Sequence, residues 1–264
     1  MQQLQDNPDK PSIGDPAAAL SLGTLFRLIS KDVVPSIGAT PFDADILKTL
    51  AVQKGERVLD IGCRDGSVSF MIQAMGAKVT GIDILQDRLD LARAKGIDAQ
   101  LQDAETMFFD NEFDAAFSHA SLHWMRRPGT VISRAYDALK QGGRFVGSFS
   151  GAGNASNVIE AFAQVLSDKN SDIADITYLL PWYLPTAQDY YKRLVAGGFT
   201  VEFCDTKIDD TAVSSGLLTA RQFLPLFSEI VPKQNENMVV EKVAQKLGEN
   251  PKIHHVTIIF KAVK

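Results

Sequence analysis

The chain has 264 residues, of which 45% are hydrophobic and 22% charged, so it is long enough to bury a full core as one large domain or two small ones. Its 27 basic and 32 acidic residues give a formal charge of -5 and form no like-charged block, which argues against nucleic acid as a partner because phosphate binding needs a concentrated basic surface. Neither a secretory signal nor an apolar run of about 18 residues is found, so we expect a cytoplasmic protein with no membrane partner.

An amphipathic helix is expected near the N-terminus, over residues 17–30. Leu20, Leu25, Leu28 and Ile29 recur there at nearly helical spacing. Because the polar face carries little basic charge, we expect this helix to fold over a ligand site rather than to bind a membrane. We assign residues 1–44 to such N-terminal lid helices.

Strand-like and helix-like segments alternate between residues 45 and 150. The expected strands are short runs rich in Val, Ile and Phe, and they cover Arg57–Ile61, Lys78–Asp83, Ala99–Gln102, Phe113–Ser118 and Arg144–Phe149. The expected helices cover Ser67–Met75, Gln86–Lys95 and Thr130–Leu139, with left-handed ends at Gly76, Gly96 and Gly142–Gly143. This alternation predicts a mostly parallel α/β sheet with helices on both faces.

The pattern changes after residue 150. Helices are expected over Ser156–Leu166 and after Thr186, a residue that can cap a helix N-terminus. Phe199–Lys207 and His255–Val263 alternate like half-exposed strands and predict an antiparallel hairpin at the sheet edge. The block at about 215–250 is then an inserted helical cap. We therefore expect one domain over 1–264, with a ligand-binding core over 45–150 and a C-terminal half over 151–264.

The strongest indication of function is the turn after the first expected strand, in the stretch VLDIGCRDG at 58–66. Gly62 and Gly66 let backbone N–H groups approach a ligand closely, although such a turn can need glycine for its geometry alone. A dinucleotide fingerprint beginning at Gly62 would also need glycine at the positions of Arg64 and Ser67. This absence disfavours a nicotinamide or flavin enzyme of the usual kind.

Two acidic residues follow the next two strands, at the same expected edge of the sheet. Asp83 lies 21 residues after Gly62, where a carboxylate can accept both hydroxyls of a ribose, although it can also cap the following helix. Asp103, in the stretch QDAE, could accept a hydrogen bond from an adenine amino group. Open parallel sheets bind ligands at this edge, which favours the ligand interpretation.

Two histidines follow the fourth expected strand at a spacing of four. On a helix, His119 and His123 would share a face as in H-E-x-x-H zinc sites, but the stretch His-Ala-Ser-Leu-His lacks the acidic residue, so no metal is expected. His119 directly follows the strand and could contact a ligand or act as a base. For His123, followed by Trp124, we favour a packed core histidine over a substrate contact.

Taken in order, VLDIGCRDG, VTGID, QDAE, FDAAFSHASLHW and ALKQGGRFV resemble the class I S-adenosylmethionine-dependent methyltransferases over about residues 50–150. The HASLHW segment, with PWYLPTAQDYYKRLVAGGF further on, is similar to the small-molecule branch that includes trans-aconitate methyltransferase. The resemblance implies a Rossmann-like fold with a seven-stranded sheet and S-adenosylmethionine as the cofactor. It also implies in-line methyl transfer to a small-molecule acceptor, with a carboxylate or hydroxyl oxygen as the expected acceptor atom.

The resemblance also implies roles for individual residues. The loop around the methionine moiety, the ribose contact, the adenine contacts and the sulfonium end would involve Asp60, Gly62, Cys63, Gly66, Asp83, Ile84, Asp103, Ala104, Glu105 and His119. His119 would also be the catalytic residue if the acceptor needs a base. Apart from the resemblance, His123, Trp124, Arg126, Trp182 and Tyr183 are candidates for substrate contacts, because a guanidinium suits a carboxylate and large rings can line an apolar pocket wall. A solvated arginine and rings packed in the core or in a lid are the alternatives.

Arg64 stands where the family usually has glycine. We expect its side chain to turn into solvent, as a long arginine can. Its presence also favours an alternative, in which a protein of this fold binds S-adenosylmethionine or S-adenosylhomocysteine without methyl transfer, as a sensor, a partner subunit or a catalyst of another reaction. The sequence does not indicate an oligomeric state.

Overall fold

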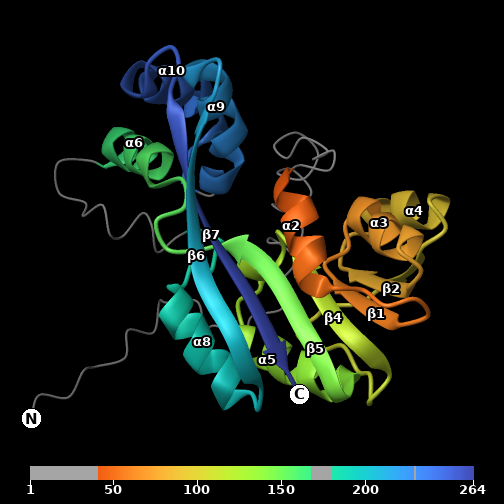
Figure 1. The fold of residues 1–264 in the computed structure, drawn as a ribbon. Coiled ribbons are helices and arrows are strands. Elements are labelled where there is room, and N and C mark those ends of the chain that lie inside the picture. Colours follow the sequence, from red (N-terminus) through yellow and green to blue (C-terminus); the bar gives the residue numbers. More distant parts are fainter. Residues whose placement is uncertain (1–40, 168–179, 229) are drawn as a thin grey trace, which may run out of the picture.

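The computed structural model describes residues 41–167, 180–228 and 230–264, so the helix expected over 17–30 lies outside the described residues. Within them, seven strands form one sheet in the order β3-β2-β1-β4-β5-β7-β6 (Figure 1). The strands are β1 (Arg57–Ile61), β2 (Lys78–Asp83), β3 (Asp98–Leu101), β4 (Phe113–His119), β5 (Leu139–Ser150), β6 (Thr200–Ala212) and β7 (Lys252–Val263). The first five are parallel, and β7 runs antiparallel between β5 and β6. The predicted fold class is confirmed.

The described helices surround this sheet and extend beyond one end of it (Figure 1). They are α2 (Pro41–Leu50), α3 (Ser67–Ala74), α4 (Gln86–Ala94), α5 (Pro128–Ala138), α6 (Ser156–Leu166), α8 (Ala187–Ala196), α9 (Gly216–Phe223) and α10 (Glu236–Leu247), with short 3-10 turns η1 (Leu122–Trp124), η2 (Leu224–Phe227) and η3 (Lys233–Asn235). As predicted, Thr186 caps α8, accepting a hydrogen bond from the backbone N–H of Asp189. None of the described helices is long and apolar enough to cross a membrane.

Side chains alternate between the two faces of β1, as the pleat of a strand requires. Val58 packs into one cluster with residues of α2 and α3, including Leu50 and Ile72. Leu59 and Ile61 pack into the opposite cluster, which contains residues of α5 and α8. Asp60 shares the parity of Val58 and therefore points toward α3, where it meets a polar partner rather than the larger apolar core.

One predicted helix end is wrong. The glycine pair Gly142–Gly143 does not terminate the helix before it, because α5 already ends at Ala138 and the pair lies inside β5. There it pairs with the end of the chain: the N–H of Gly142 donates to the carbonyl of Lys264 at 3.0 Å, and the N–H of Lys264 donates to the carbonyl of Gly143 at 2.9 Å. The conformation of this segment is thus determined by a long-range strand pairing, which no local sequence pattern reveals.

The last two strands are longer than the sequence indicates, and they carry the cap. Beyond the sheet they continue as a two-stranded ribbon, with pairs such as Ile208 with Val256 and Ala212 with Lys252. Figure 1 shows α6, α9 and α10 gathered around the far end of this ribbon. They share a second apolar cluster, in which the rings of Phe162 and Phe227 stack with centroids 4.2 Å apart. The cap therefore has a core of its own.

Gly81 gives a direct test of the packing beneath the β1 turn. A Cβ at this position in β2 would lie 2.7 Å from the sulfur of Cys63, in the small apolar cluster under α4. We expect Gly81→Ala to lower the free energy of unfolding by about 1–3 kcal/mol, measured by urea denaturation. The matched control is Gly129→Ala in α5, where the added Cβ would have no atom within 4 Å. It should be neutral or stabilising by up to about 1 kcal/mol, and equal stability of both variants would contradict this packing.

Candidate active site

The carboxyl ends of β1, β2 and β4 meet at one edge of the sheet, and a cavity of about 150 Å³ lies there. It brings together four of the residues expected at a cofactor site, Asp60, Gly62, Cys63 and His119. The Cys63 thiol itself packs among Leu89 and other apolar residues under α4. The backbone N–H of Cys63 donates to the carbonyl of Ile82 at 3.0 Å, so Cys63 shapes the turn that borders the cavity.

Packing explains both glycines of the β1 turn. Gly62 and Gly66 have φ angles of 77° and 73°, in the left-handed region that favours glycine. A Cβ at Gly62 would overlap the side chain of Ser121, and a Cβ at Gly66 would lie 2.8 Å from the Cβ of Ala92. Ser121 also donates from its Oγ to the carbonyl of Gly62 at 2.9 Å. The turn thus fits tightly against the end of β4 and against α4.

Asp83 fastens two loops to each other. Its Oδ2 accepts a hydrogen bond from the backbone N–H of Arg64, and its Oδ1 accepts one from the N–H of Leu85, both at 3.0 Å. Burial raises the pKa of this carboxyl, while these two hydrogen bonds act in the opposite direction. Each oxygen keeps a second lone pair, so the carboxylate can still accept hydrogen bonds from ligand hydroxyls.

Asp60 is the most deeply buried acid of the cavity, with 2% of its surface exposed. The Oγ of Ser69 in α3 donates to its Oδ2 at 2.5 Å. Burial raises the pKa of Asp60 to about 6, and the Ser69 hydrogen bond opposes this shift. A carboxylate with so little solvent is stabilised by a cationic ligand group, which fits the ammonium and sulfonium charges of S-adenosylmethionine.

The loop after β3 brings the expected adenine contacts to the same edge, because the N–H of Gln102 donates to the carbonyl of Asp83 at 3.1 Å. Ile84 keeps 48% of its surface exposed, whereas Ala104 is buried. Asp103 accepts a hydrogen bond from the N–H of Glu105 at 2.8 Å. Glu105 itself already holds Arg127, which donates to its two oxygens at 2.9 and 2.6 Å.

The two histidines do not share a helix face, because β4 ends at His119 and η1 begins only at Leu122. His119 lines the cavity, and its Nδ1 lies 2.8 Å from the Oγ of Ser148 in β5. His123 is buried, and this burial lowers its pKa to about 3, with smaller contributions from His119 and Arg64. Throughout the described ranges, no three His, Cys, Asp or Glu side chains are grouped so that they could hold a metal ion.

The expected substrate residues divide into two groups. The rings of His123, Trp124 and Trp182 contact one another, with centroids 5.4 to 6.1 Å apart. The indole N–H of Trp182 is buried and has no hydrogen-bond partner among the residues that the structure describes. Tyr183 instead packs against the sheet core, with the guanidinium of Arg193 over its ring. Arg126 is exposed on the surface. Consecutive side chains of an extended segment point to opposite sides, which separates Trp182 from Tyr183.

The expectation that Arg64 turns into solvent is wrong. Arg64 is partly buried and lines the cavity. Its positive charge lowers the pKa of both Asp83 and His123, although burial dominates both shifts. Sequence reasoning also missed the serines that hold the site residues, Ser69, Ser121 and Ser148. No local pattern marks them, since each meets its partner across the fold.

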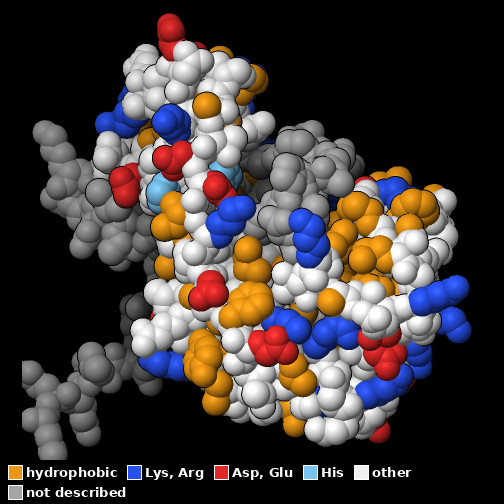
Figure 2. All heavy atoms as spheres, viewed as in Figure 1, with side chains coloured by type: hydrophobic (Ala, Val, Ile, Leu, Met, Phe, Trp, Pro, Cys, Tyr) orange, Lys and Arg blue, Asp and Glu red, His pale blue; other side chains and the backbone are white. Residues whose placement is uncertain are grey.

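The cavity opens beside an apolar surface of α3 and α4. Figure 2 shows apolar side chains gathered over these helices, and Phe70, Met75 and Leu91 are the large ones exposed there. Leu91 also lines the cavity. This edge of the sheet therefore combines buried carboxylates with apolar side chains, a combination that suits a charged nucleoside with a flat base.

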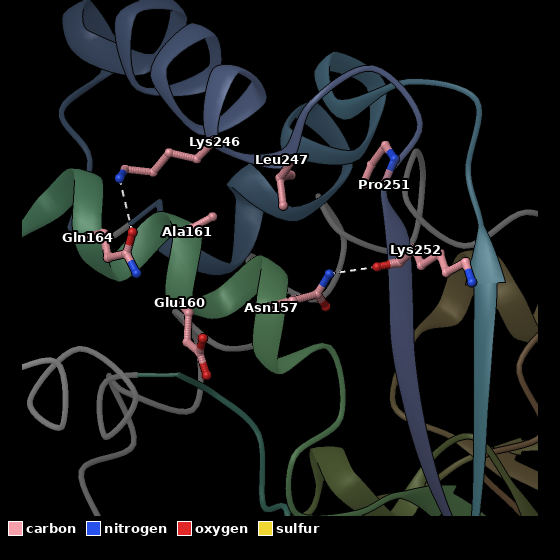
Figure 3. Close-up of a pocket in the computed structure, with 8 residues that line it drawn as sticks. All are labelled: Asn157, Glu160, Ala161, Gln164, Lys246, Leu247, Pro251 and Lys252. Carbon is pink, nitrogen blue, oxygen red and sulfur yellow. Dashed lines mark hydrogen bonds between the residues drawn. The ribbon is translucent and has the colours of Figure 1, made fainter.

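A larger cavity of about 270 Å³ lies in the cap, away from the sheet edge (Figure 3). It is bounded by α6, the end of α10 and the start of β7. Polar groups around it bond to one another: the Nζ of Lys246 donates to Gln164 at 2.9 Å, and the Nδ2 of Asn157 donates to the carbonyl of Lys252 at 2.6 Å. No residue expected at the cofactor or substrate site lines it.

Comparison with known proteins identifies the fold and the domain. The family model described as a methyltransferase domain matches residues 59–147. A Schizosaccharomyces pombe protein described as an uncharacterized methyltransferase is 29% identical over 194 residues, which cover 70% of this chain and 74% of that protein. A ubiquinone biosynthesis O-methyltransferase of Xylella fastidiosa is 29% identical over 118 residues, covering 42% of this chain and 48% of that protein.

A more distant match corresponds to the narrower resemblance in the sequence. Trans-aconitate 2-methyltransferase of Rhizobium rhizogenes is 31% identical over 103 residues, which cover 38% of this chain and 40% of that protein. The chain thus spans less than half the length of this relative and of the ubiquinone enzyme. The similarity lies in the wider group, and the trans-aconitate branch is not singled out.

Solved structures share the fold over most of the chain. An S-adenosylmethionine-dependent methyltransferase from Mesorhizobium loti has a TM-score of 0.54 at 19% identity, covering 86% of this chain and 99% of that one. The phosphoethanolamine N-methyltransferase 2 of Haemonchus contortus, solved with S-adenosylhomocysteine, has a TM-score of 0.56 at 21% identity, covering 92% and 56%. The [4+2]-cyclase SpnF has a TM-score of 0.57 at 19% identity, covering 94% of each chain.

The family match over residues 59–147 and the similarity to the yeast methyltransferase indicate an S-adenosylmethionine-dependent methyltransferase. The sheet order agrees with the fold of the solved methyltransferases. Its cofactor is S-adenosylmethionine, which fits the buried carboxylates and apolar edge described above.

The neutral state of His123 predicts a pH dependence of stability. Its pKa is about 3 in the fold and has an ordinary value of 6.5, so the unfolded chain binds the proton more tightly. Stability should therefore fall as the pH drops below about 6.5, by up to about 1.4 kcal/mol per pH unit. Urea denaturation between pH 7 and pH 4 should show this loss in the unchanged protein relative to His123→Gln.

The free energy of unfolding has to be compared between the unchanged protein and His123→Gln, because Asp60 changes stability with pH in the opposite direction. Its pKa is raised to about 6, so the stability that it contributes is present at low pH and is lost as the pH rises through about 6. This contribution is common to both proteins and cancels in the difference. Identical pH profiles for the two would contradict a buried, neutral His123.

Proposed function

We propose that this protein transfers the methyl group of S-adenosylmethionine to a carboxylate or hydroxyl oxygen of a small-molecule acceptor. The observation that carries the proposal is the course of the chain at the end of β4. His119 lines the cavity at the sheet edge, and η1 then takes His123 and Trp124 to Trp182 at the cap. One short segment therefore connects a cofactor site with a second, aromatic surface.

The roles proposed toward the cofactor follow the order of the strands. Asp83 at the end of β2 would accept hydrogen bonds from the ribose hydroxyls. Asp103, Ala104 and Ile84 would contact the adenine, to which the exposed Ile84 side chain offers an apolar face. The turn after β1, with Asp60 beneath it, would hold the methionine moiety, whose ammonium group suits the buried carboxylate.

The acceptor is proposed to bind at the aromatic cluster of His123, Trp124 and Trp182. Phe223 of the cap extends this cluster, with its ring centroid 6.4 Å from that of Trp182. Within 41–167, 180–228 and 230–264, the buried indole N–H of Trp182 finds no hydrogen-bond partner, so an acceptor oxygen there would satisfy it. Relatives named for O-methylation in ubiquinone biosynthesis and for trans-aconitate support an oxygen atom of a small organic molecule.

The bound cofactor supplies a methyl group already activated by the positive sulfonium, so the protein mainly has to align the reactants and exclude water. Alignment of this kind is worth roughly 7–11 kcal/mol of the barrier. A carboxylate acceptor needs no base. For a hydroxyl acceptor, His119 at the cavity would take the proton, with the ring oriented by its 2.8 Å contact to Ser148.

The cofactor assignment predicts a specific loss of binding in Asp83→Asn. Removing the charge from the ribose acceptor should raise the dissociation constant for S-adenosylhomocysteine about tenfold to a hundredfold, measured by calorimetric titration. The matched control is Asp90→Asn, which changes an exposed acid of α4 whose partner is Arg93, and it should bind like the unchanged protein. Unchanged affinity in Asp83→Asn would contradict the ribose role.

Methyl transfer itself is tested with isotopically labelled S-adenosylmethionine and a panel of small carboxylic acids and phenols. We expect one of these classes to yield a labelled methyl ester or methyl ether, identified by mass spectrometry. Binding of the cofactor with label appearing only on nitrogen or carbon acceptors would contradict the oxygen assignment. Binding with no acceptor turned over would favour a use of the fold other than methyl transfer, as in the cyclase SpnF.

With an acceptor in hand, Trp182→Phe should weaken its recognition. The substitution keeps an aromatic side chain but removes the indole N–H together with the five-membered ring, so we expect the KM for the acceptor to rise about five- to tenfold. The affinity for S-adenosylhomocysteine should not change. Tyr191→Phe, which removes one ring-borne donor from an exposed residue of α8, is the control. An unchanged KM in Trp182→Phe would contradict the acceptor site.

A further inference from the structure

β6 is the last strand in the sheet order, and among the described residues its outer edge pairs with no further strand. Residues 205–212 are all exposed, and Ile208 keeps 59% of its surface accessible. In this stretch β6 runs from the sheet toward the cap as part of the two-stranded ribbon (Figure 1). A two-stranded ribbon is marginally stable by itself in water, and a long exposed edge strand is a template for pairing with another strand.

The opposite edge of the ribbon is covered by the loop that precedes α6. The N–H of Val256 in β7 donates to Oδ1 of Asn154 at 3.0 Å, and its carbonyl accepts from the N–H of Gly151 at 2.9 Å. The carbonyl of His254 accepts from the N–H of Ala155 at 2.7 Å. The backbone groups of Val256 and His254 thus point away from β6. Of the two edges of the described ribbon, that of β6 is therefore the open one.

This arrangement determines which backbone groups of β6 point outward. In an antiparallel pair, residues opposite each other either exchange two hydrogen bonds or exchange none. Val256 and His254 lie opposite Ile208 and Asp210, and both bond on their other side, so these two pairs exchange none. The N–H and C=O groups of Ile208 and Asp210 therefore point outward, and by the same alternation so do those of Thr206. Within the described residues, no hydrogen bond reaches these groups.

The side chains of β6 are complementary to the same strand running in the opposite direction. When Ile208 lies opposite Ile208 of a second copy, Lys207 of each copy faces Asp209 of the other, and Thr206 faces Asp210. Opposite charges that face each other across two strands stabilise the pairing, and like charges destabilise it. The charge of Asp210 is offset within its own chain by His254, whose Nδ1 lies 2.7 Å from its Oδ1.

The neighbouring antiparallel registers bring like charges together. Pairing centred on Lys207, Asp209 or Asp210 would place that residue opposite its own copy. Pairing centred on Thr206 would place Glu202 opposite Asp210. Charges on an edge strand commonly prevent it from pairing with other strands. Here they disfavour the shifted registers and favour the one described above.

We propose that the edge of β6 binds a second copy of this chain, in an antiparallel pairing with its two-fold axis at Ile208. The two ribbons then form one four-stranded sheet, in which the Ile208 pair and both Thr206–Asp210 pairs each exchange two backbone hydrogen bonds. Two paired strands bury less surface than a standard interface of about 1,600 Å², so the dimer is weak and reversible. The proposal is independent of the cofactor and of the acceptor.

Sedimentation velocity over a series of protein concentrations tests the surface and its register. We expect a monomer–dimer equilibrium for the unchanged protein. Lys207→Asp and Asp209→Lys each place like charges opposite each other twice in the dimer, so each should raise the dissociation constant about tenfold. The double variant Lys207→Asp/Asp209→Lys exchanges the two charges. It restores both contacts across the axis as well as the 3.5 Å pair within the chain, and it should dimerise like the unchanged protein.

A second variant tests the backbone pairing. Ile208→Pro removes an N–H that points away from β7, and proline is tolerated at such a position of an edge strand. We expect a monomer with an unchanged circular dichroism spectrum. Ile208→Val is the matched control, because it keeps the N–H and a β-branched side chain, and it should dimerise.

Three outcomes would overturn the proposal. An unchanged protein that is monomeric at every concentration would leave the edge of β6 to an extended segment of another protein. A dimer that is equally strong in both single charge variants would use another surface. A double charge variant that dimerises as weakly as the single variants would contradict the register.

Discussion

The geometry of the site depends on the hydrogen bonds that the carboxylate of Asp83 accepts from two turns. By accepting the N–H groups of Arg64 and Leu85, this carboxylate joins the turn after β1 to the turn after β2. The N–H groups of Gly62 and Cys63 reinforce this joint by donating to the carbonyl of Ile82 at 2.9 and 3.0 Å. These hydrogen bonds hold the two turns against each other, and such an arrangement can position ligand-binding groups before the ligand binds.

Positively and negatively charged side chains offset one another around the turns after β1 and β2. Asp65 and Lys95 neutralise each other at the mouth of the turn, while burial keeps His123 uncharged beside Arg64. The acids Asp60 and Asp83 are both buried, and a ligand bearing positive groups would complement them.

The sequence predicts those features that short-range pattern determines. The strands β1 to β4, the glycine turn and the acids at the ends of β2 and β3 follow from periodicity and from the rule that parallel strands bind ligands at one edge. Contacts between distant segments escape such reasoning. Three features depend on neighbours that no local pattern identifies: the pairing of Gly142–Gly143 with Lys264, the extension of β6 to Ala212 through exposed residues, and the partial burial of Arg64.

The separation of the two cores has a consequence for specificity. The cofactor edge is built from β1, β2 and β4, within the stretch that matches the methyltransferase domain, which ends at residue 147. The cap core is built from α6, α9, α10 and the segment around Trp182, beyond that stretch. The two meet where His123 and Trp124 contact Trp182. Because cap residues contribute little to the cofactor edge, the shape of the aromatic surface can change while Asp60, Arg64 and Asp83 stay in place. If the acceptor binds at the aromatic cluster as proposed, its choice can change with the cap while the cofactor edge of the sheet is unchanged.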